Sequence, residues 1–207
     1  MAHGHGHGGG HGGGRRGDGP PDTPSKGGSA ATNRPDSSHA SQSREHHSAD
    51  RAGVRCLVVT VSDTRTLADD RSGDRACEIL RESGHEIRER EIVRDDRHAI
   101  AAVIRAAAAN PAIDAIVLTG GTGLAPRDVT HEAVADLLER RIDGFGELFR
   151  MLSFEEIGSA AMLSRAIAGT LGRTAVFALP GSTAAVELGV RRLVAPELGH
   201  LAGLLRS

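Results

Sequence analysis

Lysine is almost missing from this chain: the only one among its 207 residues is Lys26, near the N-terminus. A phosphate-binding loop of the GxxxxGK[ST] type and a Schiff-base lysine both need this side chain, so both are excluded downstream of residue 26. Positive charge for an anionic ligand must therefore come from arginine side chains, backbone amides or a bound metal ion.

Aromatic residues and an excess of positive charge are also missing. Trp and Tyr are absent and only four Phe occur, so platforms for base stacking are not expected. Residues 54–207 carry 19 arginines against 22 acidic side chains, whereas a nucleic-acid-binding surface is normally basic. The sequence therefore predicts no nucleic-acid partner.

Long apolar runs are lacking too. No segment approaches the ~20 residues that span a bilayer, and no signal peptide is recognised. The two cysteines, Cys56 and Cys77, fall in an expected strand and an expected helix, without metal-ligand or disulfide spacing. We expect a cytoplasmic protein without a membrane partner.

Residues 1–53 contain no Ile, Leu, Val, Phe, Tyr or Trp. Such a segment cannot bury a core, and we expect it to be a disordered tail and linker. Its first residues alternate His with Gly and can chelate a divalent metal, although a flexible, solvated tail is the favoured interpretation; the histidines are His3, His5, His7 and His11. Residues 54–207 are predicted to form one globular domain.

Strands and helices alternate in this domain. Strands are expected over Arg55–Val61, Glu86–Val93, Ile113–Leu118 and Thr174–Leu179, and helices over Ser72–Glu82, Ala99–Ala109, His131–Glu139, Phe145–Leu152, Ala160–Ile167 and from Thr183 toward Leu193. This order predicts a mostly parallel α/β sheet covered by helices on both faces. Ligands of such sheets bind beyond the carboxyl ends of the strands.

Three of the expected strands end in polar or glycine-rich sequence. These ends are Ser62-Asp63-Thr64, Thr119 to Gly123, and Pro180-Gly181-Ser182. Because parallel strands end at the same edge of a sheet, we expect the three segments to converge there. This edge is the predicted site.

The loop from Thr119 to Thr130 has the most informative sequence. Its glycines allow backbone N–H groups to approach an anion, and the helix that follows adds a favourable dipole. Arg127 and Asp128 lie in the same loop, so it can hold both a phosphate and a metal ion. The alternative is a structural turn in which Thr130 caps the helix and Arg127 and Asp128 form a solvated ion pair.

Three further segments have two interpretations each. Asp95-Asp96 can hold Mg²⁺ or orient a nucleophile, or one of the two can cap the next helix. Ser72-Gly73 can donate to a phosphate, or belong to another helix cap. Ser164-Arg165 can bind a phosphate or carboxylate, or Arg165 can form an internal salt bridge.

Together these motifs resemble the MoaB/MogA family of molybdenum cofactor biosynthesis proteins. The resemblance covers almost the whole domain from Val54 onward, and the stretch from Phe145 to Gly158 is more similar to the MoaB branch. Its motifs are Thr60-Val61-Ser62-Asp63-Thr64, Asp70-Arg71-Ser72-Gly73, Thr119 to Thr130, Ala161 to Gly169 and Leu179-Pro180-Gly181-Ser182. It implies a three-layer molybdopterin-binding fold, a homotrimer or homohexamer, and other proteins of the molybdenum cofactor pathway as candidate partners.

The resemblance also implies a reaction, in which AMP is transferred from Mg-ATP to the terminal phosphate of molybdopterin and pyrophosphate is released. The two aspartates that the family requires fall on Asp95 and Asp128, which would be catalytic and would hold Mg²⁺; Asp96 stands beside the first. The implied substrate-binding residues are Ser62, Asp63, Ser72, Gly73, Gly120, Gly121, Thr122, Gly123, Arg127, Thr130, Ser164, Arg165, Pro180, Gly181 and Ser182. The alternative is a non-catalytic protein of the same fold that binds or delivers molybdopterin.

Overall fold

A computed structural model describes residues 53–207, so the expected tail lies, except for Gly53, outside the described residues. The elements are β1 (Arg55–Val61), α2 (Arg71–Glu82), β2 (Glu86–Val93), α3 (Arg97–Ala109), β3 (Ala115–Thr119), α4 (Thr130–Ala135), β4 (Arg140–Arg141), α5 (Asp143–Ile157), η1 (Gly158–Leu163), β5 (Ile167–Leu171), β6 (Thr174–Leu179), α6 (Thr183–Gly189), η2 (Val190–Val194) and α7 (Ala195–Arg206). None of these helices is long and apolar enough to cross a membrane.

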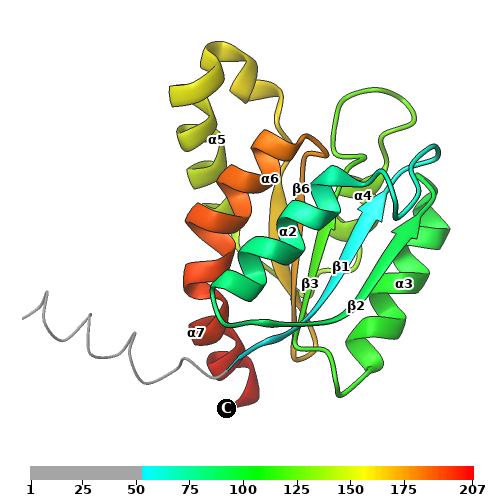
Figure 1. Cartoon of the computed structure of the whole chain (residues 1–207), viewed down its shortest axis with the longest axis vertical. Coiled ribbons are helices and arrows are strands. Elements are labelled where there is room, and N and C mark those ends of the chain that lie inside the picture. Colours follow the sequence, from blue (N-terminus) through cyan, green and yellow to red (C-terminus); the bar gives the residue numbers. More distant parts are fainter. Residues whose placement is uncertain (1–52) are drawn as a thin grey trace, which may run out of the picture. The chain divides into compact units, whose positions relative to one another are not determined.

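The strands form one six-stranded sheet in the order β2-β1-β3-β6-β5-β4. The pairs β2–β1, β1–β3 and β3–β6 are parallel, whereas β5 runs antiparallel to both β6 and β4. The expected α/β class with a mostly parallel sheet is therefore confirmed (Figure 1). The carboxyl ends of β1, β3 and β6 lie next to one another, where the glycine loop begins.

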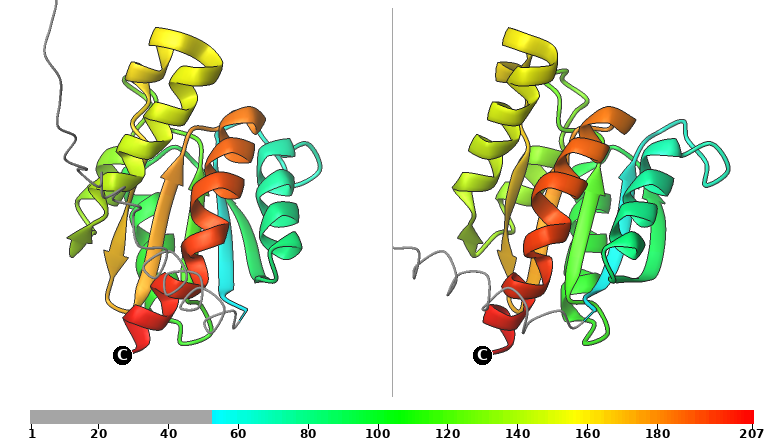
Figure 2. Two further views of the ribbon diagram at one scale, coloured as in Figure 1. Left: turned by 90° about the vertical axis from the view of Figure 1, so that its left-hand side faces the viewer. Right: turned by 60° about the vertical axis from the view of Figure 1, so that its left-hand side comes forward.

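Two apolar layers flank the sheet, because successive strand side chains point to opposite faces. On β1, Val58 packs in one layer, with Phe149 of α5 and residues of α2, α6 and α7. Its neighbour Val59 packs in the other layer, with Ile104 of α3 and Val134 of α4. Helices thus cover both faces, which gives three layers (Figure 2). Cys56 and Cys77 are free and buried as β1 and α2 residues, and burial raises the pKa of Cys56 to about 12.

The prediction of a helix over Ala160–Ile167 is wrong. Helix α5 ends at Ile157, and its C-cap Gly158 has a φ of 62°, which ordinary residues avoid. The short 3-10 helix η1 follows, over Gly158–Leu163. Ile167 then begins a strand that pairs with β6. Gly169 leaves room for β4, because a Cβ there would overlap the carbonyl oxygen of Arg140. Pairing with the next strand of the chain, through a two-residue turn, overrides the helix preference of this segment.

Other boundaries also differ from the sequence prediction. Helix α4 ends at Ala135 rather than Glu139, and α5 spans Asp143–Ile157 rather than Phe145–Leu152. The last helix, expected to run toward Leu193, passes through a π turn and continues to Arg206. It continues because Leu198 and Ala202 are buried against the core.

Asp114, just before β3, connects the two ends of the domain. Its carboxylate accepts hydrogen bonds from Nε and Nη2 of Arg55, at 2.8 and 2.9 Å, and from the backbone N–H of Arg55 at 3.0 Å. Arg206 of α7 lies 3.0 Å from the same carboxylate. The Arg55 side chain lowers the pKa of Asp114 well below its usual range, and Arg206 adds to this effect.

Asp114→Asn is expected to reduce the free energy of unfolding at pH 7 by on the order of 1–3 kcal/mol, since charge-assisted hydrogen bonds are lost. A pKa lowered by folding adds stability that is fully present above the unfolded value of about 3.9 and is lost progressively as pH falls from there through the folded pKa. Urea unfolding should therefore show a smaller difference between the wild type and the variant at pH 3 than at pH 7. The exposed Asp143→Asn, which breaks a surface pair with Arg141, is the control; a difference for Asp114→Asn that does not change with pH would contradict this account.

Candidate functional site

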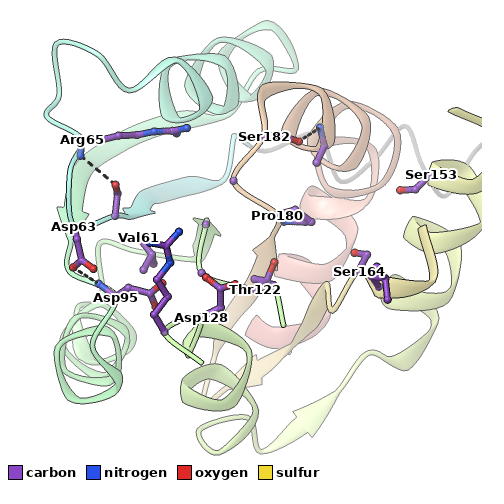
Figure 3. A pocket seen from close by; sticks show the side chains of 18 of the residues that line it. Val61, Asp63, Arg65, Asp95, Thr122, Asp128, Ser153, Ser164, Pro180 and Ser182 are labelled. Atoms are coloured by element: carbon purple, nitrogen blue, oxygen red, sulfur yellow. Dashed lines mark hydrogen bonds between the residues drawn. The ribbon is translucent and has the colours of Figure 1, made fainter. Parts of the chain in front are cut away.

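A cavity of about 730 Å³ lies at the carboxyl edge of the sheet (Figure 3). It brings together the ends of β1, β3 and β6, so the expected convergence of the three segments is confirmed. Phe149 and Ser153 of α5 and Leu163 of η1 close another side. The expected site residues that line it are Ser62, Asp63, Asp95, Gly120, Gly121, Thr122, Gly123, Arg127, Asp128, Ser164, Pro180, Gly181 and Ser182.

Two glycines give the loop after β3 its path. Gly120 and Gly121 have φ values of 102° and 63°, which ordinary side chains rarely adopt. A Cβ on Gly120 would overlap the carbonyl oxygen of Val61, and one on Gly121 would overlap the hydroxyl of Thr130 and lie 2.7 Å from Asp95 Oδ1. The loop backbone can therefore pass close to the neighbouring strand end and to Asp95 only because these residues are glycines.

The amides of this loop are not all equivalent. The N–H of Gly120 donates to the carbonyl of Leu179 at 3.0 Å, so it is not available to a ligand as the sequence suggested. The N–H groups of Gly121, Thr122 and Gly123 make no hydrogen bond with any residue of 53–207. These three amides remain as donors for an anion.

Three carboxylates line the cavity beside the glycine loop (Figure 3). Asp63 follows β1, Asp95 follows β2, and Asp128 lies in the loop itself. Asp95 accepts a hydrogen bond from the N–H of Val129 at 3.2 Å, and its own N–H donates to Asp63 at 3.2 Å. Burial raises the pKa of Asp95, and the negative charges of Asp128 and Asp63 raise it further. The site thus concentrates negative charge that a cation would relieve.

Asp95 and Asp96 divide the two roles expected for the pair. Asp96 is the N-cap of α3, where its side chain accepts from the N–H of Ala99 at 2.8 Å. Asp95 lines the cavity. The carboxylate that faces the site is therefore Asp95.

Arg165 does not line the main cavity, and the internal salt bridge is the interpretation that the structure supports. Its guanidinium forms an ion pair with Glu132. It also donates to the carbonyls of Thr122 and Asp128, each at 3.1 Å, and to that of Gly123. Arg165 thus fixes the glycine loop through its backbone carbonyls.

Three other expected residues also lie away from the cavity wall. Ser72 and Gly73 begin α2, where the hydroxyl of Ser72 and the N–H of Gly73 both donate to Asp70 at 3.0 Å; this is the helix cap given as the alternative. Thr130 is fully buried behind Gly121, and its hydroxyl has no partner within residues 53–207. Ser164 lines the cavity, and its buried hydroxyl likewise lacks a partner in that range.

Several residues that line the cavity were not predicted from the sequence. Arg65 directly follows Ser62-Asp63-Thr64, so its position after a strand end was the signal that could have found it. No local pattern marks the wall formed by α5 and η1, because those helices reach the site only through tertiary packing. The missed residues include Arg65, Phe149, Ser153, Ile157, Ala160, Leu163 and Ala185.

The carboxylates fit a magnesium ion that arrives with a phosphate. Mg²⁺ is usually held by one or two carboxylates, with phosphate oxygens and waters completing its coordination. Asp95 and Asp128 offer this number, and their mutual repulsion would be relieved by a cation. Within residues 53–207 no group of three or more His, Cys, Asp or Glu side chains could hold a metal on its own.

Comparison with known proteins gives one consistent result. The family described as "Probable molybdopterin binding domain" matches residues 57–200. Molybdenum cofactor biosynthesis protein B of Bacillus cereus is 52% identical over 149 residues, which are 72% of this chain and 88% of that protein. The Bacillus subtilis protein of the same name is 49% identical over 155 residues, 74% of this chain and 91% of its own length.

Solved structures agree with these relatives. A crystal structure of a molybdenum cofactor biosynthesis protein B superposes with a TM-score of 0.74 at 50% identity, covering 75% of this chain and 98% of that one. The tungsten cofactor synthesizing protein MoaB from Pyrococcus furiosus gives a TM-score of 0.64 at 34% identity, covering 75% and 98%.

Proposed function

Because this chain belongs to the MoaB/MogA family of molybdenum cofactor biosynthesis proteins, we propose that it is a molybdopterin adenylyltransferase. It transfers AMP from Mg-ATP to the terminal phosphate of molybdopterin and releases pyrophosphate. One observation carries the proposal: Asp95 and Asp128 face the same cavity, beside the free amides of the glycine loop. This combination provides both ligands for a metal ion and donors for a phosphate.

The proposed reaction needs alignment more than it needs a nucleophile from the protein. An oxygen of the molybdopterin phosphate attacks the α-phosphorus of ATP, and the bond from that phosphorus to the pyrophosphate breaks. The attacking phosphate is already ionised, so no side chain has to remove a proton. When bound, Mg²⁺ supplies charge neutralisation to the ATP phosphates and to the departing pyrophosphate.

The residues of the chain have separate parts in this proposal. Asp95, just after β2, and Asp128, in the loop between β3 and α4, would hold the cation. The amides from Gly121 to Gly123 orient a phosphate without rearrangement, because Arg165 already holds their carbonyls. The cytoplasm is the proposed location, consistent with two free, buried cysteines.

The direct test is to incubate the purified protein with molybdopterin and Mg-ATP and to detect adenylyl-molybdopterin and pyrophosphate by chromatography. Product that requires Mg²⁺ supports the proposal. Saturable molybdopterin binding without ATP-dependent product would instead establish the non-catalytic binding protein.

We further propose assembly as a homotrimer or homohexamer, supported by an apolar face on α5 and η1. Its exposed side chains are Leu148, Met151, Phe154, Ile157, Met162 and Leu163. Several exposed apolar side chains on one pair of neighbouring helices are typical of an interaction surface.

Phe154→Ser is expected to shift the protein toward smaller species in sedimentation velocity, by at least about tenfold in the dissociation constant, since a buried aromatic anchor would be lost. Leu204→Ser on α7, at a similarly exposed apolar position (59% against 61%), is the control. Equal sedimentation of both variants and the wild type would show that this face is not the interface.

A further inference from the structure

Positive charge in the main cavity comes from two side chains. Of the residues that line it, Arg65 and Arg127 are the cationic ones, and Arg165 is engaged by the loop carbonyls and Glu132 behind it. Arg127 belongs to the glycine loop, whereas Arg65 lies in the loop after β1 (Figure 3). A polyanionic ligand in the cavity would therefore meet one arginine from each of two loops.

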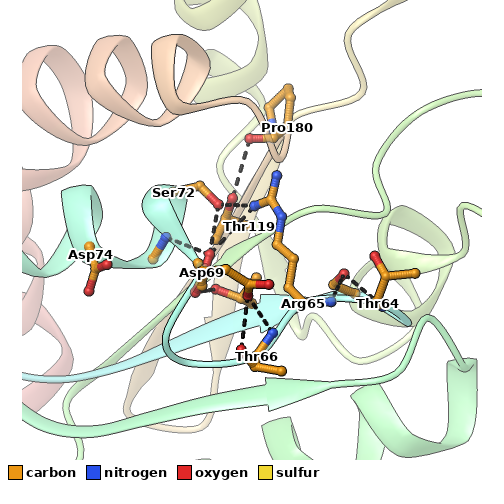
Figure 4. Close-up of polar contacts among 12 residues, drawn as sticks. Thr64, Arg65, Thr66, Asp69, Ser72, Asp74, Thr119 and Pro180 are labelled. Carbon is orange, nitrogen blue, oxygen red and sulfur yellow. Dashed lines mark hydrogen bonds and ion pairs between the residues drawn. The ribbon is translucent and has the colours of Figure 1, made fainter.

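Arg65 is held by a buried polar cluster. Its Nη1 donates to the hydroxyl of Ser72 at 2.5 Å and lies 3.5 Å from Asp70 Oδ1 (Figure 4). Ser72 and Asp70 are both 0% exposed. Asp70 also accepts from the hydroxyl of Thr60 at 2.5 Å and from the N–H of Gly73 at 3.0 Å, so its carboxylate is fixed on several sides.

Asp70 has a second cation besides Arg65, and it lies closer. Arg90 of β2 lies 3.1 Å from the other oxygen of Asp70 and also pairs with Asp74. Burial alone would raise the pKa of Asp70, but hydrogen bonds from Thr60, Gly73 and Arg90 lower it. The carboxylate thus stays ionised with Arg90 as its closer cation, which leaves the charge of Arg65 for another partner.

The free edge of Arg65 has the geometry for an oxyanion. Within residues 53–207 the only hydrogen-bonding partners of its guanidinium are Ser72 and Asp70, both through Nη1. The Nε–H and one Nη2–H of a guanidinium are parallel and can bind two oxygens of one phosphate or carboxylate together. The side chain of Arg65 is 39% exposed, so this edge remains accessible at the cavity.

We propose that Arg65 binds a phosphate oxyanion of the ligand through Nε and Nη2, and that Ser72 and Asp70 position its guanidinium. The inference rests on the proposed function only for the identity of the ligand as a phosphate compound. Arg65 would then be a binding residue, and Ser72 a positioning residue that acts through it.

The probe is inorganic pyrophosphate, titrated calorimetrically into the full-length protein with and without Mg²⁺. Arg65→Gln is expected to weaken binding about ten- to a hundredfold, as for the loss of a charge-assisted contact. Arg65→Lys keeps the charge but not the paired donors, and about a threefold to tenfold loss is expected. Arg105→Gln, an exposed residue of α3 that does not line the cavity, makes the same charge change and should bind like the wild type.

Ser72 is tested by a double-mutant cycle. Ser72→Ala should weaken pyrophosphate binding about threefold to tenfold by releasing the guanidinium, yet have no further effect in the Arg65→Gln background. A purely structural role would give equal losses in both backgrounds. Pyrophosphate affinity of Arg65→Gln equal to that of Arg105→Gln, or no measurable binding by the wild type, would overturn the proposal. If Arg65 controls pyrophosphate binding but no adenylyl-molybdopterin forms, the inference stands and the proposed enzymatic function fails.

Discussion

Asp128→Asn is expected to lower the rate of adenylyl-molybdopterin formation by about 100-fold or more, in the range found when a key electrostatic group is removed from an active site. The substitution removes one negative charge but keeps an oxygen that can accept from the N–H of Ala125, as Asp128 does at 3.2 Å. The loop should therefore keep its conformation while its affinity for a cation falls. The measurement is the initial rate at saturating molybdopterin over a range of Mg²⁺ concentrations.

Asp96→Asn is the matched control for Asp128→Asn. It removes the same charge one residue from Asp95, but at the N-cap of α3, where Asn serves as well as Asp. We expect its rate to remain within about twofold of the wild type, since no group in the site changes. If Asp128→Asn were as active as Asp96→Asn, the role given to Asp128 would be wrong; if the wild type and Asp128→Asn were equally inactive, the proposed enzymatic function itself would fail.

Gly121→Ala is expected to have the second large effect. It should lower the free energy of unfolding by roughly 1–3 kcal/mol from backbone strain and crowding, and should abolish pyrophosphate binding. The added Cβ would overlap the hydroxyl of Thr130 and lie 2.7 Å from Asp95 Oδ1. Either the loop or Asp95 has to move, and both belong to the site. Urea unfolding and pyrophosphate titration measure the two effects.

Gly172→Ala separates strain from crowding. Gly172 has a similar φ, 56° against 63°, but no atom lies within 4 Å of the position of its Cβ. It should lose roughly 1 kcal/mol from the unfavourable φ and leave ligand binding intact. Equal behaviour of the two alanine variants would mean that the crowding around Gly121 has no consequence for the site.

Strands β1, β3 and β6 could be predicted because they are buried and read as continuous apolar runs, whereas β2 was recognised by its alternation of charged residues with Ile and Val. Arg55–Val61 and Thr174–Leu179 were predicted with their observed bounds. The strand Ile167–Leu171 was not predicted, because it follows helix-forming residues and its first residue was assigned with them to a helix. The signal that could have found it is local: β5 and β6 form a hairpin whose two-residue turn is Gly172-Arg173, with Gly172 at a φ of 56°.

The position of the site could also be predicted, but the direction of its side chains could not. Parallel strands end at the same edge of a sheet, so the sequence alone predicted that Asp63, Gly121 and Ser182 lie close together. All three line the cavity. Arg165 points away from the cavity because three backbone carbonyls and Glu132 attract it. Which of several possible partners an arginine binds depends on distances in the folded protein. The spacing of residues in the sequence does not give these distances.

The contacts of Arg165 have a consequence for how the loop meets a ligand. Carbonyls of Thr122, Gly123 and Asp128 are already fixed, so the backbone between them loses its conformational entropy when the chain folds. Little further ordering then opposes the binding of a phosphate, and more of the contact free energy appears as affinity. We therefore expect this loop to bind a phosphate as a preorganised receptor, at a rate that does not depend on a loop movement.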